Sequence, residues 1–295
     1  MKSSATRSIR VSIALMLWLA APGIGWAGEV VAVLSSDHDS YQEAFKGFEE
    51  AFGQRVPSLG LSQGAPRIEK GTRVVVAFGG RAALSSYPSD VVLIYCMAPG
   101  IEVDPDSRVD VIEIRVPPPI GPSLSKLKDI QPELNKLAVF WASKSMDGYI
   151  QELQKRSRHF GVEILPQKLS SSAELPDRLR GLYGKINGIW VLPDPLVVNA
   201  QNMLIVQEFS SSNKTPLYAP MSEFVKEGAT ASVSSNFREI GRVAAIAAQA
   251  ALNGKPTDSI LYAERLEVSI NLKAAENGGL HISRNVLEKA DKIFP

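Results

Sequence analysis

Short apolar runs recur along the chain, and most are continuous rather than alternating with polar residues. Continuous apolar runs are typical of strands that are covered on both faces, as in a parallel sheet. The pattern predicts such strands at residues 30–34, 73–78, 91–95, 136–141, 188–192 and 230–233. The run at residues 110–116 alternates instead, which predicts an edge or half-exposed strand.

Between these strands, apolar residues recur at the spacing of one helix face. Such stripes predict helices that pack against a sheet. They comprise Tyr41, Ala44, Phe45, Phe48 and Phe52; Met146, Tyr149, Ile150 and Leu153; and Phe237, Ile240, Val243, Ala244, Ala247, Ala248 and Ala251. Strands that alternate with helices imply parallel sheets with right-handed crossover connections.

The elements form two series. The first runs from Glu29 to about Val116, and the second begins with a helix at residues 123–130. The segment 117–122 between them contains four prolines and a glycine, which interrupt regular structure and predict a linker. The sequence therefore predicts an α/β protein of two lobes.

The first 27 residues have the pattern of a secretory signal peptide. Lys2, Arg7 and Arg10 precede an apolar run of nine residues at 13–21, and small residues stand before a cleavage position after Ala27. We therefore expect export to the periplasm. Nine apolar residues are too few to span a membrane, which takes about 20. No later segment is long and apolar enough, so we expect that the processed protein does not span the membrane.

Composition narrows the classes of function. Removal of residues 1–27 takes away three positive charges and changes the formal net charge from +1 to −2. This balance argues against a nucleic-acid partner, which would favour a basic patch. With 45% hydrophobic and 21% charged residues the chain is globular. Its single cysteine, Cys96, lies in an apolar run, where a buried and inert thiol is expected.

Candidate catalytic residues do not form a recognisable constellation. The three histidines, His38, His159 and His281, are far apart, and no metalloprotease, redox, nucleophile-elbow or phosphate-loop motif occurs. We therefore expect no metal, no cofactor and no catalysis.

Polar residues follow several predicted strands at their carboxyl ends, which is where open parallel sheets bind ligands. Free N–H groups of helices that begin there suit a carboxylate, and serine hydroxyls or an aspartate add further polar contacts. The candidates are Ser35, Ser36 and Asp37 after the first strand, Gly79, Gly80 and Arg81 after the strand at 73–78, Ser143 and Ser145 after the strand at 136–141, and Asp194 after the strand at 188–192. A role in a helix cap or a tight turn remains open for each of them.

Five segments of the chain resemble one known family. They are residues 78–83 (Phe-Gly-Gly-Arg-Ala-Ala), 131–140, 189–194 (Ile-Trp-Val-Leu-Pro-Asp), 214–223 and the alanine-rich helix that opens with Asn236-Phe-Arg-Glu-Ile-Gly-Arg242. Together they resemble the ABC-transporter substrate-binding family that contains tryptophan- and tyrosine-binding proteins. The resemblance implies the type I periplasmic-binding-protein fold, with each lobe a parallel sheet flanked by helices.

The resemblance also implies roles for individual residues. Asp194 would lie in the ligand cleft, Ser222 would face the site, and the helix at residues 236–253 would return to the first lobe. We accordingly expect lobe one to comprise residues 28–120 plus about 234–256, and lobe two 121–233 plus about 257–295. The stretch between Phe52 and Thr72 is short for the family, so the first lobe is expected to be abbreviated.

We therefore expect a periplasmic protein that binds a small polar solute, an amino acid or other carboxylate, and delivers it to an ABC permease in the inner membrane. Two alternatives stay open. One is a ligand-sensing or partner-binding module that has lost transport, and the other is an envelope hydrolase.

Overall fold

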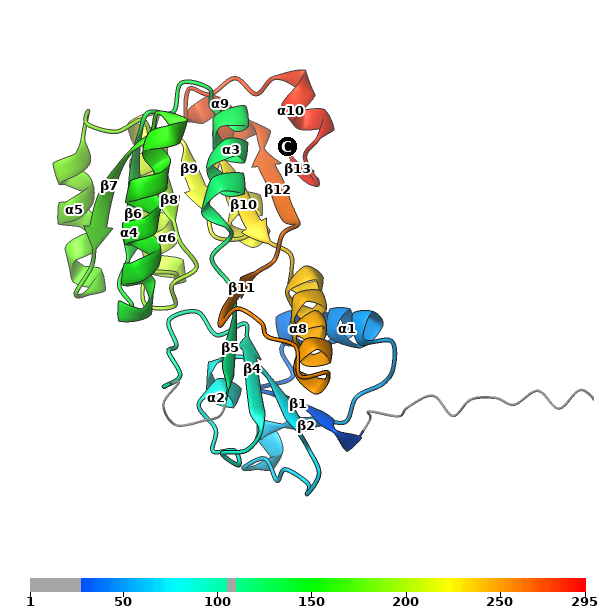
Figure 1. Ribbon diagram of the computed structural model, residues 1–295. Coiled ribbons are helices and arrows are strands. Elements are labelled where there is room, and N and C mark those ends of the chain that lie inside the picture. The colour runs from blue at the N-terminus through cyan, green and yellow to red at the C-terminus, as the bar shows by residue number, and fades with distance from the viewer. Residues whose placement is uncertain (1–27, 105–109) are drawn as a thin grey trace, which may run out of the picture.

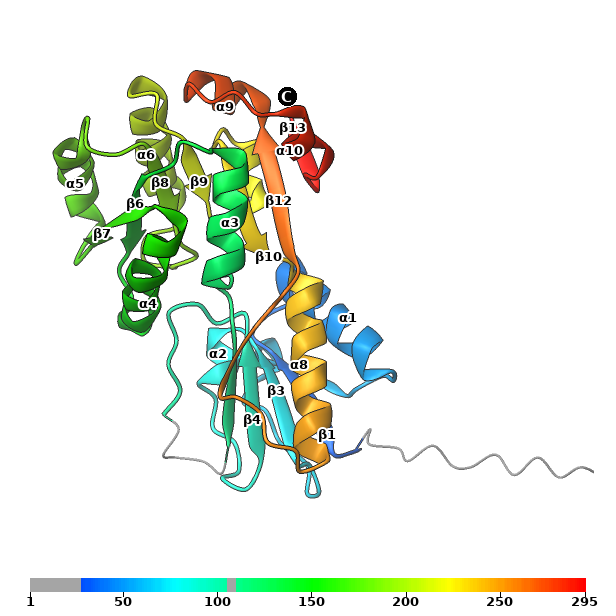
Figure 2. The same cartoon turned by 45° about the horizontal axis from the view of Figure 1, so that its top comes forward.

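The computed structural model describes residues 28–104 and 110–295. The predicted signal peptide lies outside this part of the chain. The described residues form two lobes, each built around one sheet, and three connections run between the lobes (Figures 1 and 2). The predicted α/β architecture with two lobes is confirmed.

The first lobe holds a six-stranded sheet in which every neighbouring pair is parallel. The strands of residues 30–34 and 74–78 are buried along their whole length, as continuous apolar runs predict. In sheet order the strands are β11 (Ile260–Tyr262), β5 (Val111–Arg115), β4 (Val92–Cys96), β3 (Val74–Phe78), β1 (Val30–Leu34) and β2 (Ser58–Gly60).

Two long helices cover one face of this sheet. They are α1 (Asp39–Phe52) and α8 (Phe237–Leu252), whose apolar stripes pack on the strands and on each other. The two helices approach so closely that a Cβ at Gly47 would overlap the backbone of Arg238, and a Cβ at Gly241 would overlap the backbone of Ala44. Glycine at both positions therefore permits direct backbone contact between α1 and α8.

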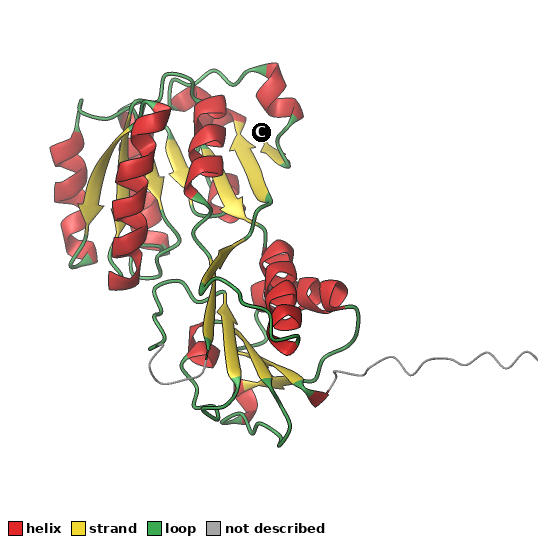
Figure 3. Ribbon diagram, viewed as in Figure 1, coloured by secondary structure: helices red, strands yellow, loops and turns green. Residues whose placement is uncertain are grey.

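The other face of the first sheet is covered mainly by loops (Figure 3). The regular elements there are α2 (Gly80–Ala83) and a single 3₁₀ turn, η2 (Leu61–Gln63), and no α-helix separates β2 from β3. Partly buried apolar residues of these loops, including Ile68, Ile101 and Val103, pack on the sheet in place of helices. The first lobe is thus abbreviated on this face.

The second lobe holds a seven-stranded sheet that is parallel except for the antiparallel pair β10 and β12. In sheet order its strands are β13 (Lys292–Phe294), β12 (Leu266–Asn271), β10 (Ala231–Ser235), β9 (Leu217–Ala219), β8 (Gly188–Val191), β6 (Lys136–Trp141) and β7 (Glu163–Lys168).

Helices cover both faces of the second sheet. One face packs on α3 (Ile120–Ile130), α4 (Asp147–Ser157), α9 (Leu272–Asn277) and α10 (Arg284–Glu288). The other face packs on α5 (Leu175–Leu182), α6 (Ala200–Ser212) and α7 (Ser222–Lys226). Single 3₁₀ turns occur at η4 (Lys144–Met146), η5 (Arg158–Phe160) and η6 (Ser172–Glu174).

The alternating strand, β5, is half-exposed, which is one of the two possibilities that its pattern predicted. It is not an edge strand, because β11 pairs with its outer side. The same pairing places the last crossing between the lobes later in the chain than the sequence predicted. The chain was expected to leave the first lobe near residue 256, but Ile260–Tyr262 still belong to the first sheet.

Candidate functional site

A cleft between the two lobes encloses a cavity of about 270 Å³. The second lobe contributes the ends of β8, β9 and β10, and the first lobe contributes α1 and the beginning of α8. Its lining residues are Glu43, Val116, Pro193, Pro220, Met221, Ser222, Glu223, Ser234, Ser235, Asn236, Phe237, Arg238, Glu267 and Lys292. The cleft therefore lies beyond the carboxyl ends of parallel strands, where open α/β sheets bind ligands.

The second-lobe wall of this cleft carries an ion pair that joins three separate segments. Lys292 Nζ lies 2.8 Å from Glu267 Oε1 and donates to Ser222 Oγ at 3.1 Å. Glu267 lies on β12, Lys292 on the neighbouring strand β13, and Ser222 at the first position of α7. Of all the residues predicted for the site, Ser222 alone lines this cleft.

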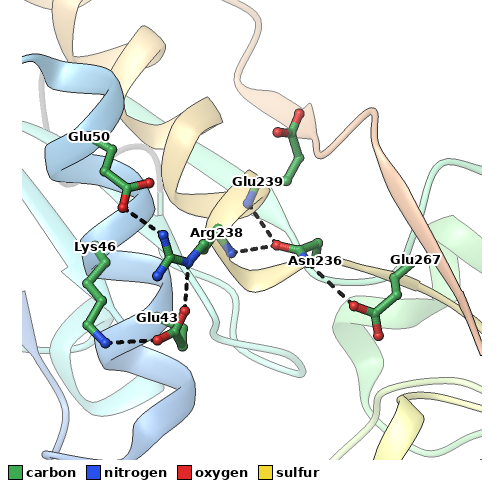
Figure 4. Close-up of polar contacts among 7 residues, drawn as sticks. All are labelled: Glu43, Lys46, Glu50, Asn236, Arg238, Glu239 and Glu267. Atoms are coloured by element: carbon green, nitrogen blue, oxygen red, sulfur yellow. Dashed lines mark hydrogen bonds and ion pairs between the residues drawn. The ribbon is translucent and has the colours of Figure 1, made fainter. Parts of the chain in front are cut away.

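On the first-lobe wall, Arg238 of α8 forms ion pairs with α1 (Figure 4). Its Nε donates to Glu43 Oε2 at 2.8 Å, and its Nη1 donates to Glu50 Oε1 at 2.6 Å, so that one guanidinium joins α8 to α1. Glu43 Oε1 also accepts from Lys46 at 2.9 Å. The hydrogen bonds from Lys46 and then Arg238 hold the pKa of Glu43 below its ordinary value.

Asn236 connects the two walls (Figure 4). As the N-cap of α8, its Oδ1 accepts from the backbone N–H groups of Arg238 at 2.9 Å and Glu239 at 3.3 Å. Its Nδ2 donates to Glu267 Oε2 at 3.5 Å. The cap that begins a first-lobe helix is therefore bonded to a second-lobe strand, at one of the crossings between the lobes.

The structure brings the predicted residues Ser143 and Asp194 into direct contact, but neither of them lines this cleft. Asp194 is fully buried. Its carboxylate accepts from the N–H groups of Ala142 at 2.8 Å, Ser143 at 2.7 Å and Leu196 at 3.0 Å, and from the Ser143 hydroxyl at 2.8 Å. Both oxygens are thus occupied by groups of the second lobe, which is the arrangement of a turn brace.

Gly100, in a loop of the first lobe, lies close to this brace. Gly100 has φ +82°, and a Cβ there would lie 2.8 Å from Ser143 Oγ and 3.4 Å from the ring of Pro195. The two lobes are therefore in van der Waals contact at this point. The predicted residue Ser145 lies close by, at a cavity of about 10 Å³ that Gly100 also lines. Its buried hydroxyl has no hydrogen-bond partner among the described residues.

The predicted residues of the first lobe support the turn after β3. Ser35 is buried, and its hydroxyl accepts from the N–H of Ala82 in α2 at 2.9 Å. Gly79 has φ +100°, donates to Cys96 O at 2.8 Å and packs against Ser35. Gly80 begins α2. Of the three others, Asp37 and Arg81 are exposed and Ser36 is half-buried. All six lie outside the lining of the cleft.

Sequence reasoning missed most of the residues that line the cleft. Asn236 follows β10 at its carboxyl end, so the rule that selected Asp194 would also have selected it. Glu43 belongs to a helix that was assigned by its apolar stripe, and Arg238 to one that was assigned by its stripe and by the family resemblance, and neither signal singled out these two side chains. Lys292 carried no local signal, because only the pairing of β13 with β12 brings it to the cleft.

Three further properties of the described residues bear on chemistry and on the membrane. Cys96 is buried as predicted, and burial raises the pKa of its thiol far above the ordinary value. No group of three or more histidine, cysteine, aspartate or glutamate side chains among them is placed to hold a metal ion. No helix in the same part of the chain has the length and apolar character needed to cross a membrane.

Comparisons with known proteins identify a sequence relative of this chain. A tyrosine-binding protein of Clostridioides difficile (strain R20291) is 27% identical over 143 residues, which are 48% of this chain and 41% of that relative. The chain thus aligns with about two fifths of that relative's length.

Solved structures share the fold at low identity. The ABC domain in complex with L-Trp from Streptococcus pneumonia matches with a TM-score of 0.63 and 18% identity, over 90% of this chain and 99% of that one. A ligand-free, open substrate-binding protein with adhesive properties from Clostridium difficile matches with a TM-score of 0.64 and 17% identity, over 90% and 98%.

The sequence profile of one family, described as ABC transporter substrate binding protein, matches residues 119–294. This range covers well over half of the chain and supplies most of the cleft lining. The chain therefore belongs to the ABC transporter substrate-binding protein family.

Proposed function

We propose that this substrate-binding protein closes its two lobes on a small polar solute, an amino acid or another small carboxylate, in the cleft between α7 and α1. The observation that carries the proposal is the cleft itself. Its walls come from both lobes, and its volume of about 270 Å³ is close to the lower end of the range for small-molecule sites. A ligand there would contact both lobes and so favour the closed state over an open one.

The charges of the lining support a solute that carries both signs. Three carboxylates (Glu43, Glu223 and Glu267) and two cations (Arg238 and Lys292) surround the cavity. Serine hydroxyls at residues 222, 234 and 235 add neutral hydrogen-bonding groups. A neutral zwitterion suits this balance better than a sugar, which offers no charge, or a polyamine, which offers only positive charge. The relatives named for tyrosine and L-Trp are consistent with an amino acid.

The proposed mechanism is binding followed by delivery. The protein would act in the periplasm after removal of residues 1–27, and would present the closed lobes to an ABC permease in the inner membrane. The membership of a substrate-binding family supports this role. No covalent step is part of it.

A thermal-shift screen tests the proposal. The panel contains amino acids, small carboxylates, sugars and polyamines. A ligand at about 100 times its dissociation constant adds about 2.7 kcal/mol of stability. For a chain of this size that gain raises the unfolding midpoint by about 5–10 °C. We expect a shift of this size from at least one amino acid or small carboxylate. No shift from either class would contradict the proposal.

A further inference from the structure

Lys292 is the cation that reaches the cleft from the last strand. An ammonium group has three N–H donors, and Glu267 and Ser222 accept two of them. No third partner occurs among the described residues. The side chain is 47% exposed while that of Glu267 is 16% exposed. The ammonium is therefore fixed in position by a shielded carboxylate and keeps a free donor.

Ser234 lies beside this ion pair. It stands directly opposite Glu267 in the antiparallel pair β10 and β12, and directly opposite residues point to the same face of a sheet with Cβ atoms about 4.5–5.5 Å apart. Ser234 is 8% exposed and lines the cleft. Its hydroxyl makes no hydrogen bond to another described residue. It is not among the fully enclosed hydroxyls that lack a partner, so it is open to the cleft and available to a group that enters there.

The three carboxylates of the cleft lining differ in whether their oxygens are free to accept a further hydrogen bond. Both oxygens of Glu267 are used, by Lys292 and Asn236. Both oxygens of Glu43 are used as well, by Lys46 and Arg238. Glu223 lies in the first turn of α7, is exposed, and forms no ion pair within the described part of the chain. It is the carboxylate of the lining that remains available to an incoming cation.

We propose that Lys292 and Ser234 hold the carboxylate of an α-amino acid, with its ammonium group toward Glu223. This assignment rests on the proposed function and names the chemical class of the solute and its orientation. A charge-assisted hydrogen bond from Lys292 and a second from Ser234 give the carboxylate its two strongest contacts. Glu267 acts through Lys292 by fixing the position of the ammonium, and is a positioning residue.

Calorimetric titration of the purified protein tests the assignment. The probes are the L-amino acids that raise the unfolding midpoint, each paired with its carboxamide, which keeps the ammonium and lacks the carboxylate charge. The variants are Lys292→Met, the double variant Lys292→Met/Glu267→Gln, and the control Lys226→Met. The double variant removes both charges of the pair, so no buried carboxylate is left without its partner. Lys226 is exposed at the end of α7 and lies outside the cleft lining.

We expect the carboxamide, the single variant and the double variant each to weaken binding by about tenfold or more, which corresponds to the loss of one charge-assisted contact. Lys226→Met should bind as the wild type does. If the wild type binds amino acids and the double variant binds them equally well, the Lys292 assignment is wrong while the proposed function stands. Equal affinity for acid and carboxamide would also overturn it. If the wild type binds no amino acid, the proposed amino-acid site fails together with the assignment.

Discussion

The Ser143 hydroxyl donates to one oxygen of Asp194 at 2.8 Å, while the Ser143 N–H donates to the other oxygen at 2.7 Å. This double contact joins the turn after β6 to the turn after β8. Asp194 N–H donates to Leu192 O at 2.7 Å, and Asp194 O accepts from the N–H of Val197 at 3.0 Å, so the aspartate also organises its own turn. Its immediate role in this structure is to brace two adjacent strand ends.

Replacement of Asp194 by alanine should therefore lower stability strongly. The change removes the acceptor of three backbone N–H groups and one hydroxyl in a fully buried position. We expect the free energy of unfolding to fall by about 3–5 kcal/mol, measured by urea denaturation. Asp177→Ala is the control, because that side chain is 74% exposed in its pair with Arg180 and should cost less than about 1 kcal/mol. Equal losses in the two variants would refute the brace.

Gly241 leads to a second prediction about stability. A Cβ at this position would overlap the backbone of Ala44 and crowd that of Phe48, and a helix backbone cannot yield as a flexible side chain does. Gly241→Ala should therefore destabilise the protein by about 3 kcal/mol, at the upper end of the usual range for overpacking. In Gly148→Ala, a Cβ on α4 meets no atom within 4 Å. That control should raise stability by about 0.5–1 kcal/mol through helix propensity. The two midpoints in urea should move in opposite directions, and a shared direction would contradict the close contact of α1 and α8.

The contact of Gly100 with the second lobe predicts an effect on closure. Gly100→Ala adds a Cβ against Ser143 and Pro195, so it should favour lobes that are further apart. We expect about fivefold weaker ligand binding or more, together with a larger radius of gyration by small-angle X-ray scattering in the presence of ligand. Gly53→Ala is a matched control, because Gly53 has nearly the same φ of +83° and a Cβ there meets no atom within 4 Å. If both variants weaken binding and enlarge the radius of gyration equally, backbone strain rather than the contact between the lobes explains the effect. If Gly100→Ala behaves as the wild type does, the predicted effect on closure is wrong.

Glu239 predicts a dependence of stability on pH. The hydrogen bonds from Arg242, at 2.6 and 2.8 Å, hold the pKa of Glu239 below its ordinary value of 4.5. Because the pKa is lower in the folded than in the unfolded chain, Glu239 stabilises the fold above about pH 4.5, and the contribution is lost as the pH falls through the folded-state value. Glu239→Gln should cost about 1 kcal/mol at pH 7 and less at pH 3, measured by urea denaturation at both values. A cost that does not change with pH would contradict this assignment.

Local patterns in the sequence were sufficient for most of the fold. The stripes that end at Phe52 and begin at Phe237 predicted α1 and α8, because burial of one helix face leaves a periodic record. The placement of β11 left no such record. Residues 260–262 form a three-residue strand with partly exposed side chains, and their pairing with β5 depends on a contact distant in sequence.

The same distinction, between local patterns and contacts that are distant in sequence, explains which residues of the site could be predicted. The carboxyl-end rule found residues that follow strands, and of these Ser143 and Asp194 serve the turns themselves. A sequence cannot reveal that a carboxylate has already been satisfied by nearby N–H groups. It also cannot show that Lys292 lies beside Ser222, since 69 residues separate them in the chain and the contact follows from the order of strands in the sheet.

A crystal structure of the protein grown with the amino acid that gives the largest thermal shift would show where the solute binds. We expect the ligand in the cleft between the lobes, with its carboxylate within hydrogen-bonding distance of Lys292 Nζ and its ammonium group toward Glu223. A ligand bound at the Ser143 and Asp194 turn instead, or outside the space between the lobes, would refute the proposed site.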